Sequence, residues 1–248
     1  EGPESVIFEE TVEGGLLTQA PFLRFAGLIG AITLDANGLV NDFPVGQHMT
    51  FGKFSGASSV DDTFHTEVLL LWHSNPGYTW IPYHHYITEA RYRGAKVVAI
   101  APDVNAASVA ADTFVPIQPG TDAALALSMC KVIIEEGLLD EGFVLSQTDL
   151  PLLVDRDSGR FLRESEVTGD GLEDQFYHWT DDGLTPASRS SLFIERPEPA
   201  LRGAWSTTLS DGTEVELTTV WEMLLARLED YTPEAASEMC GVHPEVIR

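Results

Sequence analysis

Three short apolar runs, each followed by turn-forming residues and then by a helical pattern, constrain the fold of this chain most strongly. The runs occupy residues 67–72, 96–101 and 113–117, and each has the length of a buried strand. The helical patterns that follow them occupy residues 83–93, 106–111 and 123–136. This alternation predicts an α/β fold, in which a doubly wound, mostly parallel sheet with right-handed crossovers is flanked by helices.

The sequence on either side of this core has a different character. Residues 1–61 are rich in glycine and lack sustained periodicity, which favours loops with short helices and strands. Residues 151–248 combine acidic insertions with a predicted hairpin (204–217) and two C-terminal helices (220–228 and 233–239). We therefore expect three segments: a loop-rich segment 1–61, an α/β core 62–150, and a third segment 151–248.

Charge excludes two classes of partner. The chain carries 39 acidic and 14 basic residues, a net charge of −25, which repels nucleic acids and anionic membranes. No apolar run approaches the roughly 20 residues of a membrane helix, so no direct membrane insertion is expected. Lysines are scarce beside this excess of carboxylates, which favours adaptation to high salt over an acidic interaction surface or chance.

The predicted loops at the carboxyl ends of the three strands carry the groups that a nucleotide needs, since ligands bind at that edge of an open parallel sheet. The first loop offers Ser74 and Asn75, and the second offers Asp103 as an acceptor for ribose hydroxyls. The third loop, residues 120–122, offers a glycine that lets a ligand approach the backbone closely, a threonine that can donate to anionic oxygens, and the carboxylate of an aspartate. The carboxylate of Asp122 could accept guanine N1–H and N2–H2 together.

Each of these residues also has a purely structural interpretation. Asp103 and Asp122 are good helix N-caps, and Asn75 and Gly120 are ordinary turn residues. Neither a G-x-G-x-x-G fingerprint after a strand nor a G-x-x-x-x-G-K-[ST] loop is present, which disfavours the common NAD and ATP sites.

No metal centre or catalytic nucleophile is predicted within the chain. His84 and His85 are adjacent, so on a helix their side chains would point about 100° apart, and no third ligand has metal spacing. Cys130 and Cys240 lie far apart in helical patterns, where we expect small buried side chains.

Four separated motifs resemble the molybdopterin oxidoreductases of the dimethyl sulfoxide reductase family. They are W-x-S-N-P at Trp72 to Pro76, E-A-R-Y-R-G-A-K-V-V at residues 89–98, P-D at residues 102–103, and P-G-T-D-A-A-L-A-L at residues 119–127. Residues 148–154 and 160–163 are similar to the subgroup of nitrate, selenate and chlorate reductases and ethylbenzene and dimethyl sulfide dehydrogenases.

The resemblance implies that the loops bind one guanosine diphosphate arm of a bis-molybdopterin guanine dinucleotide that carries molybdenum. The implied cofactor-binding positions are Trp72, Ser74, Asn75, Pro76, Asp103, Gly120, Thr121 and Asp122. His73 departs from the family, in which many relatives have glycine, and could narrow the loop. The cluster-binding cysteines and the molybdenum-ligating aspartate of the family belong to an earlier segment, so we expect no catalytic residue or metal ligand here.

The resemblance also implies the function of a larger catalytic subunit, of which this chain would be an internal fragment, inactive when isolated. The implied reaction is oxygen-atom transfer coupled to electron transfer, with a respiratory nitrate reductase expected first. The alternatives are a selenate or chlorate reductase, an ethylbenzene or dimethyl sulfide dehydrogenase, or a free-standing nucleotide-binding or scaffold module. Expected partners are the rest of the subunit and an iron–sulfur electron-transfer subunit, with twin-arginine export and membrane association through partner subunits.

Overall fold

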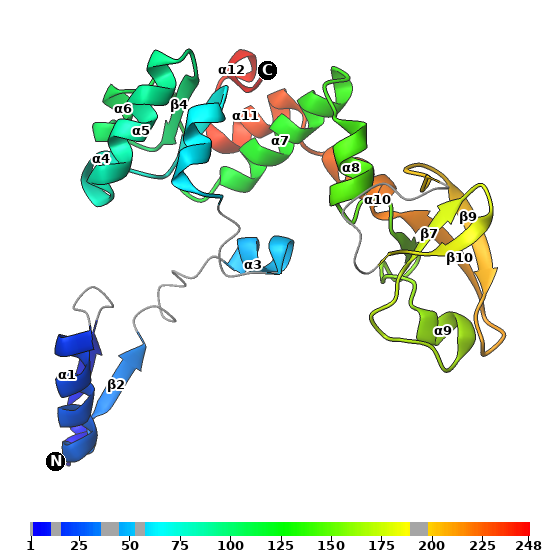
Figure 1. Ribbon diagram of the computed structural model, residues 1–248, viewed down its shortest axis with the longest axis horizontal. Coiled ribbons are helices and arrows are strands. Elements are labelled where there is room, and N and C mark those ends of the chain that lie inside the picture. The colour runs from blue at the N-terminus through cyan, green and yellow to red at the C-terminus, as the bar shows by residue number, and fades with distance from the viewer. Residues whose placement is uncertain (1, 11–15, 36–44, 53–57, 189–197) are drawn as a thin grey trace. The chain divides into compact units, whose positions relative to one another are not determined.

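The computed structural model describes residues 2–10, 16–35, 45–52, 58–188 and 198–248 (Figure 1). The chain divides into two compact units, Glu1–Thr63 and Phe64–Arg248. The expected division into segments at residues 61 and 150 stays a prediction. The mixed α/β fold class predicted from the sequence is confirmed, with parallel sheets, small antiparallel sheets and a hairpin.

The first unit contains a helix that the sequence did not predict. The strands β1 (Ile7–Glu10) and β2 (Ile32–Asp35) pair in parallel, and α1 (Leu16–Ile29) joins them. The sequence of α1 shows no helical period, because apolar side chains such as Leu28 are also exposed and the helix has no separate polar face. The short helices η1 (Pro3–Ser5), α3 (Val45–Phe51) and η3 (Val60–His65) complete this part of the chain.

The second unit is built on the predicted parallel sheet. Its strands are β3 (Val68–Trp72), β4 (Lys96–Ala101) and β5 (Thr113–Pro116), in that spatial order. Leu71 aligns with Ala99 and Ile100 with Val115, so the three strands run in the same direction and their carboxyl ends share one edge. The three strands predicted from the sequence are confirmed to within one residue at each end.

Helices cover both faces of this sheet, as a doubly wound fold requires. The side chains of β4 alternate, so that Val97 and Ala99 pack toward α5 (Ile81–Tyr92) and α6 (Ala106–Val109). The opposite face, which carries Ile100, packs against three other helices: α7 (Asp122–Glu135), α11 (Pro233–Cys240) and α12 (Pro244–Ile247). A short helix, α4 (Pro76–Thr79), follows β3 directly.

A smaller antiparallel region follows the parallel sheet in sequence. After α8 (Glu141–Gln147), strands β6 (Leu153–Asp155), β10 (Glu214–Thr219) and β9 (Ala204–Thr208) form a sheet in the order β6-β10-β9. The predicted hairpin over residues 204–217 is confirmed as β9 and β10. A second hairpin, β7 (Tyr177–Thr180) with β8 (Gly183–Pro186), was not predicted, and only its turn at residues 180–183 lies in an acidic stretch interpreted from the sequence as a surface excursion. The helices here are α9 (Glu164–Thr168) and α10 (Val220–Leu228).

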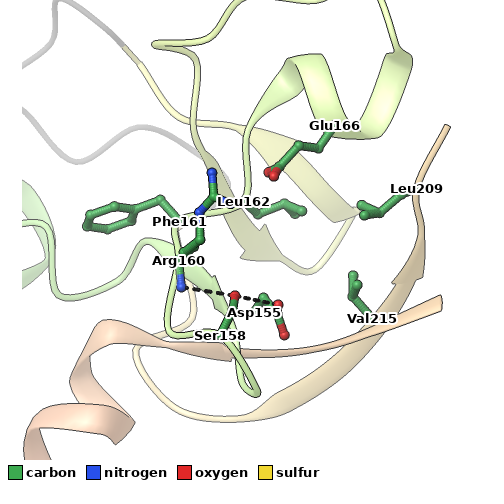
Figure 2. A pocket seen from close by; sticks show the side chains of 8 residues that line it. All are labelled: Asp155, Ser158, Arg160, Phe161, Leu162, Glu166, Leu209 and Val215. Atoms are coloured by element: carbon green, nitrogen blue, oxygen red, sulfur yellow. Dashed lines mark hydrogen bonds between the residues drawn. The ribbon is translucent and has the colours of Figure 1, made fainter. Parts of the chain in front are cut away.

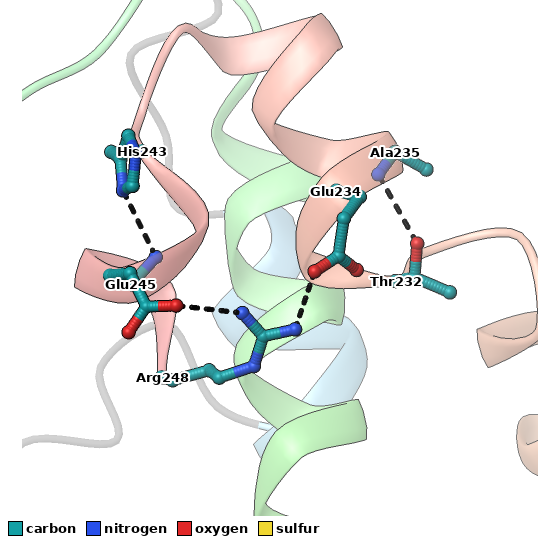
Figure 3. Close-up of polar contacts among 6 residues, drawn as sticks. All are labelled: Thr232, Glu234, Ala235, His243, Glu245 and Arg248. Atoms are coloured by element: carbon teal, nitrogen blue, oxygen red, sulfur yellow. Dashed lines mark hydrogen bonds and ion pairs between the residues drawn. The ribbon is translucent and has the colours of Figure 1, made fainter.

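Hydrogen bonds and ion pairs stabilise the ends of the C-terminal helices α11 and α12 (Figure 3). The hydroxyl of Thr232 accepts a hydrogen bond from the Ala235 amide at 3.2 Å and so caps the N-terminus of α11. The guanidinium of Arg248 contacts Glu234 at 2.5 Å and Glu245 at 3.7 Å. These contacts join the last residue of the chain to the first turns of α11 and α12.

Candidate functional site

The loops after β3 and β5 meet at the carboxyl edge of the sheet. The indole Nε1–H of Trp72 donates a hydrogen bond to Oδ1 of Asp122 at 2.6 Å. The imidazole Nε2 of His73 lies 2.8 Å from the same oxygen. The other oxygen, Oδ2, has no hydrogen-bond partner among the described residues. The structure therefore brings together two predicted site residues, Trp72 and Asp122, through contacts that also involve His73.

Trp72 is positioned by the sheet and by the core. It is the last residue of β3, aligned with Ile100 of β4, and it packs half-buried against the cluster that contains Ile100 and Leu125. The next residue extends the ladder, because the His73 amide donates to the Ile100 carbonyl at 2.8 Å. The indole therefore has a fixed position from which to hold Asp122.

His73 adopts a backbone conformation that favours glycine. Its φ is 49°, and it is the only non-glycine with positive φ in the described part of the chain. The left-handed region costs a residue with a Cβ about 1–2 kcal/mol. The departure at His73 noted in the sequence therefore has a structural meaning, since glycine would adopt this conformation without strain.

The third loop leaves the start of α7 without a side-chain cap. Thr121 is the N-cap, but its hydroxyl donates back to the Gln118 carbonyl at 2.7 Å instead of accepting from the helix. Gly120 precedes it with φ 82° and no atom within 4 Å of where a Cβ would lie. Asp122 is the first helical residue, so the alternative in which it is the N-cap is wrong. The first amides of α7 are thus available to an anionic group.

The first loop turns directly into α4. Asn75 precedes this helix, and Pro76 is buried at its first helical position. The Asn75 Oδ1 atom is buried and has no hydrogen-bond partner among the described residues. A Cβ on Gly77 would lie 3.0 Å from the Cβ of Ala106, so glycine permits α4 to approach α6 closely. Ser74 is exposed beside them.

The second loop places Asp103 in the open. Its side chain is exposed, and the N-cap of α6 is Asn105, which accepts from the Ala107 amide at 2.9 Å. The N-cap alternative for Asp103 is therefore wrong. Sequence reasoning missed Asn105, although an asparagine three residues before a serine is a recognisable capping signal.

An apolar pocket adjoins the site. It has a volume of about 360 Å³ and lies between the ends of β4 and β5 and the C-terminus of α11, with walls that include Pro102, Pro119 and Cys240. The Gln118 amide donates to the Cys240 carbonyl at 3.0 Å, which ties the third loop to α11. Cys240 is buried as predicted, whereas Cys130 is exposed, so the prediction of burial for Cys130 was wrong. Its position on the outer side of α7 explains this.

Within the described residues, no group of three or more histidine, cysteine, aspartate or glutamate side chains could hold a metal ion. His84 has a buried Nδ1 without a partner in the described part of the chain, and His85 packs on Tyr86 with ring centroids 4.4 Å apart. None of the described helices is long and apolar enough to cross a membrane.

A second pocket, of about 180 Å³, lies in the antiparallel region (Figure 2). The Ser158 hydroxyl donates to Asp155 at 2.5 Å, and this hydrogen bond holds the pKa of the Asp155 carboxyl below its ordinary value. Glu166 reaches the pocket from α9, and Leu209 and Val215 approach from the β9–β10 hairpin. The Asp155 carboxylate is thus already engaged by the turn beside it.

Comparison with known proteins identifies the family. The molybdopterin oxidoreductase family matches residues 3–229. The chain belongs to this family. It is 38% identical to the chlorate reductase α subunit of Ideonella dechloratans over 94% of this chain and 26% of that protein. The dimethylsulfide dehydrogenase α subunit of Rhodovulum sulfidophilum is 35% identical, over 92% of this chain and 25% of that protein.

A respiratory nitrate reductase α subunit of Haloferax mediterranei is 31% identical over 91% of this chain and 24% of that protein. These identities support the alternative of a chlorate reductase or dimethylsulfide dehydrogenase better than the nitrate reductase that was expected first. The chain spans about a quarter of the length of these relatives. The acetylene hydratase of Pelobacter acetylenicus has the same fold, with a TM-score of 0.51 and 21% identity over 99% of this chain and 24% of that one.

The arrangement of the three loops fits the guanosine diphosphate arm of a molybdopterin dinucleotide. The contacts of Asp122 with described residues are made by Oδ1, which leaves Oδ2 as an acceptor, and the buried Asn75 Oδ1 has no partner among the described residues. The uncapped start of α7 offers donors to phosphate oxygens, and the open space beside Gly120 admits a ligand to the backbone. Acceptors for a base and donors for a phosphate thus lie on the same sheet edge.

Proposed function

We propose that this chain forms part of the guanine-dinucleotide-binding portion of the catalytic subunit of a molybdenum oxidoreductase. The convergence of Trp72 and His73 on one oxygen of Asp122, which leaves the other oxygen open at the sheet edge, carries this proposal. Membership of the molybdopterin oxidoreductase family supports the identity of the ligand.

Each loop has a role in binding. Asp122 reads the guanine edge, since a carboxylate accepts N1–H and N2–H2, which no adenine presents together. The amides of the first turn of α7 and the backbone at Gly120 hold phosphate oxygens. Asp103 accepts from ribose hydroxyls, because its carboxylate is exposed at the end of β4. Ser74 and Asn75 supply short polar groups, and Trp72 and Pro76 fix the backbone around them.

The parent enzyme transfers oxygen atoms to or from a small oxyanion or sulfide substrate, in the manner of chlorate reductase or dimethylsulfide dehydrogenase. The molybdenum cofactor supplies this chemistry when bound, and the protein places it. The remainder of the catalytic subunit and an iron–sulfur electron-transfer subunit are the proposed partners. This chain binds one dinucleotide arm of the cofactor and does not supply the atoms that react.

Guanine selectivity tests the proposal. Guanosine diphosphate should bind to the 248-residue chain more tightly than adenosine diphosphate in calorimetric titrations. Asp122→Asn should abolish the preference, at a cost of roughly 2–4 kcal/mol in guanosine diphosphate binding, because an amide presents a donor where guanine presents another.

The same variant separates binding from folding. Asparagine retains an acceptor for the Trp72 indole, so the midpoint of thermal unfolding should change little. In the full-length parent protein, molybdenum content measured after desalting should fall in parallel with guanosine diphosphate affinity. Equal affinity for the two diphosphates, with no effect of Asp122→Asn, would move the base-reading role to another residue and favour a general nucleotide module.

A further inference from the structure

The two oxygens of Asp122 differ in what they can still accept. Oδ1 is contacted by the Trp72 indole at 2.6 Å and by the His73 imidazole at 2.8 Å. A carboxylate oxygen has about two lone-pair positions, so the hydrogen bond from the indole and the imidazole nitrogen at 2.8 Å leave no room for a further donor at Oδ1. Oδ2 retains both of its positions, because no described residue donates to it.

A guanine edge needs both oxygens. Its N1–H and N2–H2 groups lie side by side, and a carboxylate that pairs with two parallel donors places one oxygen opposite each. One of the two groups at Oδ1 must therefore leave before guanine can pair fully. Trp72 is held by the core beneath it, whereas the side chain of His73 is 37% exposed and its backbone is in the left-handed region. His73 is the group that can leave.

We propose that His73 blocks the acceptor position on Asp122 Oδ1 that the second N–H group of a bound guanine requires. Guanine displaces the His73 side chain when it binds. This inference rests on the proposed function, since it concerns the same carboxylate. It makes His73 a residue that determines how strongly the site selects guanine.

The occupied position affects two purines differently. Hypoxanthine has N1–H but lacks the N2 amino group, so it can pair with Oδ2 while His73 keeps its contact with Oδ1. Guanine gains two hydrogen bonds but loses the histidine contact. His73 therefore weakens the binding of guanine and leaves that of hypoxanthine nearly unchanged, which lowers the preference for guanine.

The experiment compares guanosine diphosphate with inosine diphosphate. Both are titrated calorimetrically into the 248-residue chain and into His73→Gly, which relaxes a positive φ. We expect His73→Gly to tighten guanosine diphosphate binding roughly tenfold, as for one recovered hydrogen bond to a charged group, and to leave inosine diphosphate within about a factor of two. His73→Asn, which tolerates the same backbone and has a shorter side chain, should change the ratio in the same direction.

Displacement also has a spectroscopic signature. The imidazole resonances of His73 should shift on addition of guanosine diphosphate and stay in place on addition of inosine diphosphate, whereas a merely structural histidine would respond to both alike. Equal tightening of the two nucleotides, or weakening of guanosine diphosphate, would overturn the inference while leaving guanine binding intact. Failure of guanosine diphosphate to bind any variant would overturn the proposed function and this inference with it.

Discussion

The indole of Trp72 and the carboxylate of Asp122, fifty positions apart in sequence, share a hydrogen bond of 2.6 Å that crosses the end of β4. Trp72→Phe removes the donor and keeps most of the packing. We expect a loss of about 1–2 kcal/mol in the free energy of unfolding, as for a hydrogen bond to a charged group that is partly exposed. Urea unfolding measures it. Trp80→Phe is the matched control, because Trp80 is 54% exposed and should give a smaller loss.

The conformation of His73 gives a second test. His73→Gly and His73→Ala both remove the imidazole, but only alanine has to place a Cβ in the left-handed region. His73→Ala should therefore be less stable than His73→Gly by about 1 kcal/mol in chemical denaturation. Equal stability of the two variants would show that the loop relaxes away from positive φ when the contact with Asp122 is removed.

Asp112 makes the stability of the fold depend on pH in the acidic range. The Val97 amide donates to its carboxylate at 2.9 Å, and Arg91 donates to it at 3.0 Å, and together they lower the pKa of the Asp112 carboxyl. The unfolded-state pKa of this carboxyl is 3.8, and its folded-state pKa is lower. Asp112 therefore stabilises the fold at pH values above 3.8, and this stabilisation is lost as the pH falls through the folded-state pKa. In Asp112→Asn, the midpoint of thermal unfolding should therefore fall less than in the unchanged chain when the pH is lowered below about 4.

The net charge of −25 predicts a dependence on salt. Screening of carboxylate repulsion should raise the midpoint of thermal unfolding as potassium chloride increases toward molar concentration. A midpoint that stays constant or falls with salt would remove the argument for a salt-loving source. Comparing potassium chloride with equal concentrations of an uncharged osmolyte separates screening from general exclusion of solute.

The sequence predicted the parts of the fold whose local signals agree with their surroundings. Strands β3 to β5 are short apolar runs bounded by turn residues, and α11 begins with a threonine cap followed by Pro233, so period and capping point to the same boundaries. Helix α1 escaped prediction because its apolar residues are not confined to one face. The β7–β8 hairpin escaped because its short strands, YHWT and GLTP, contain neither a continuous apolar run nor a clear alternation of apolar and polar residues.

The position of Asp122 at the sheet edge was predictable, but its contacts were not. Placing Asp122 at the sheet edge needs only the order of strands and helices. The partner of its carboxylate depends on where the β3 loop turns, and that turn is set by the positive φ of His73, a conformation that sequence statistics assign to glycine. Asp122 was consequently considered as a helix cap or a base reader, and its bond to Trp72 was not foreseen.

The packing of α11 and α12 against the sheet has a consequence for biosynthesis. Ile100, Val115 and Leu125 share their apolar cluster with Cys240 and Ile247, so this side of the sheet is covered only in part by α7 until residues 233–247 have been synthesised. At ribosomal speeds of about 5–20 residues per second, more than a hundred intervening residues represent a delay on the order of ten seconds. During that interval the nascent strands present apolar surface that only the later helices bury, so this part of the chain is exposed to aggregation while it is being synthesised.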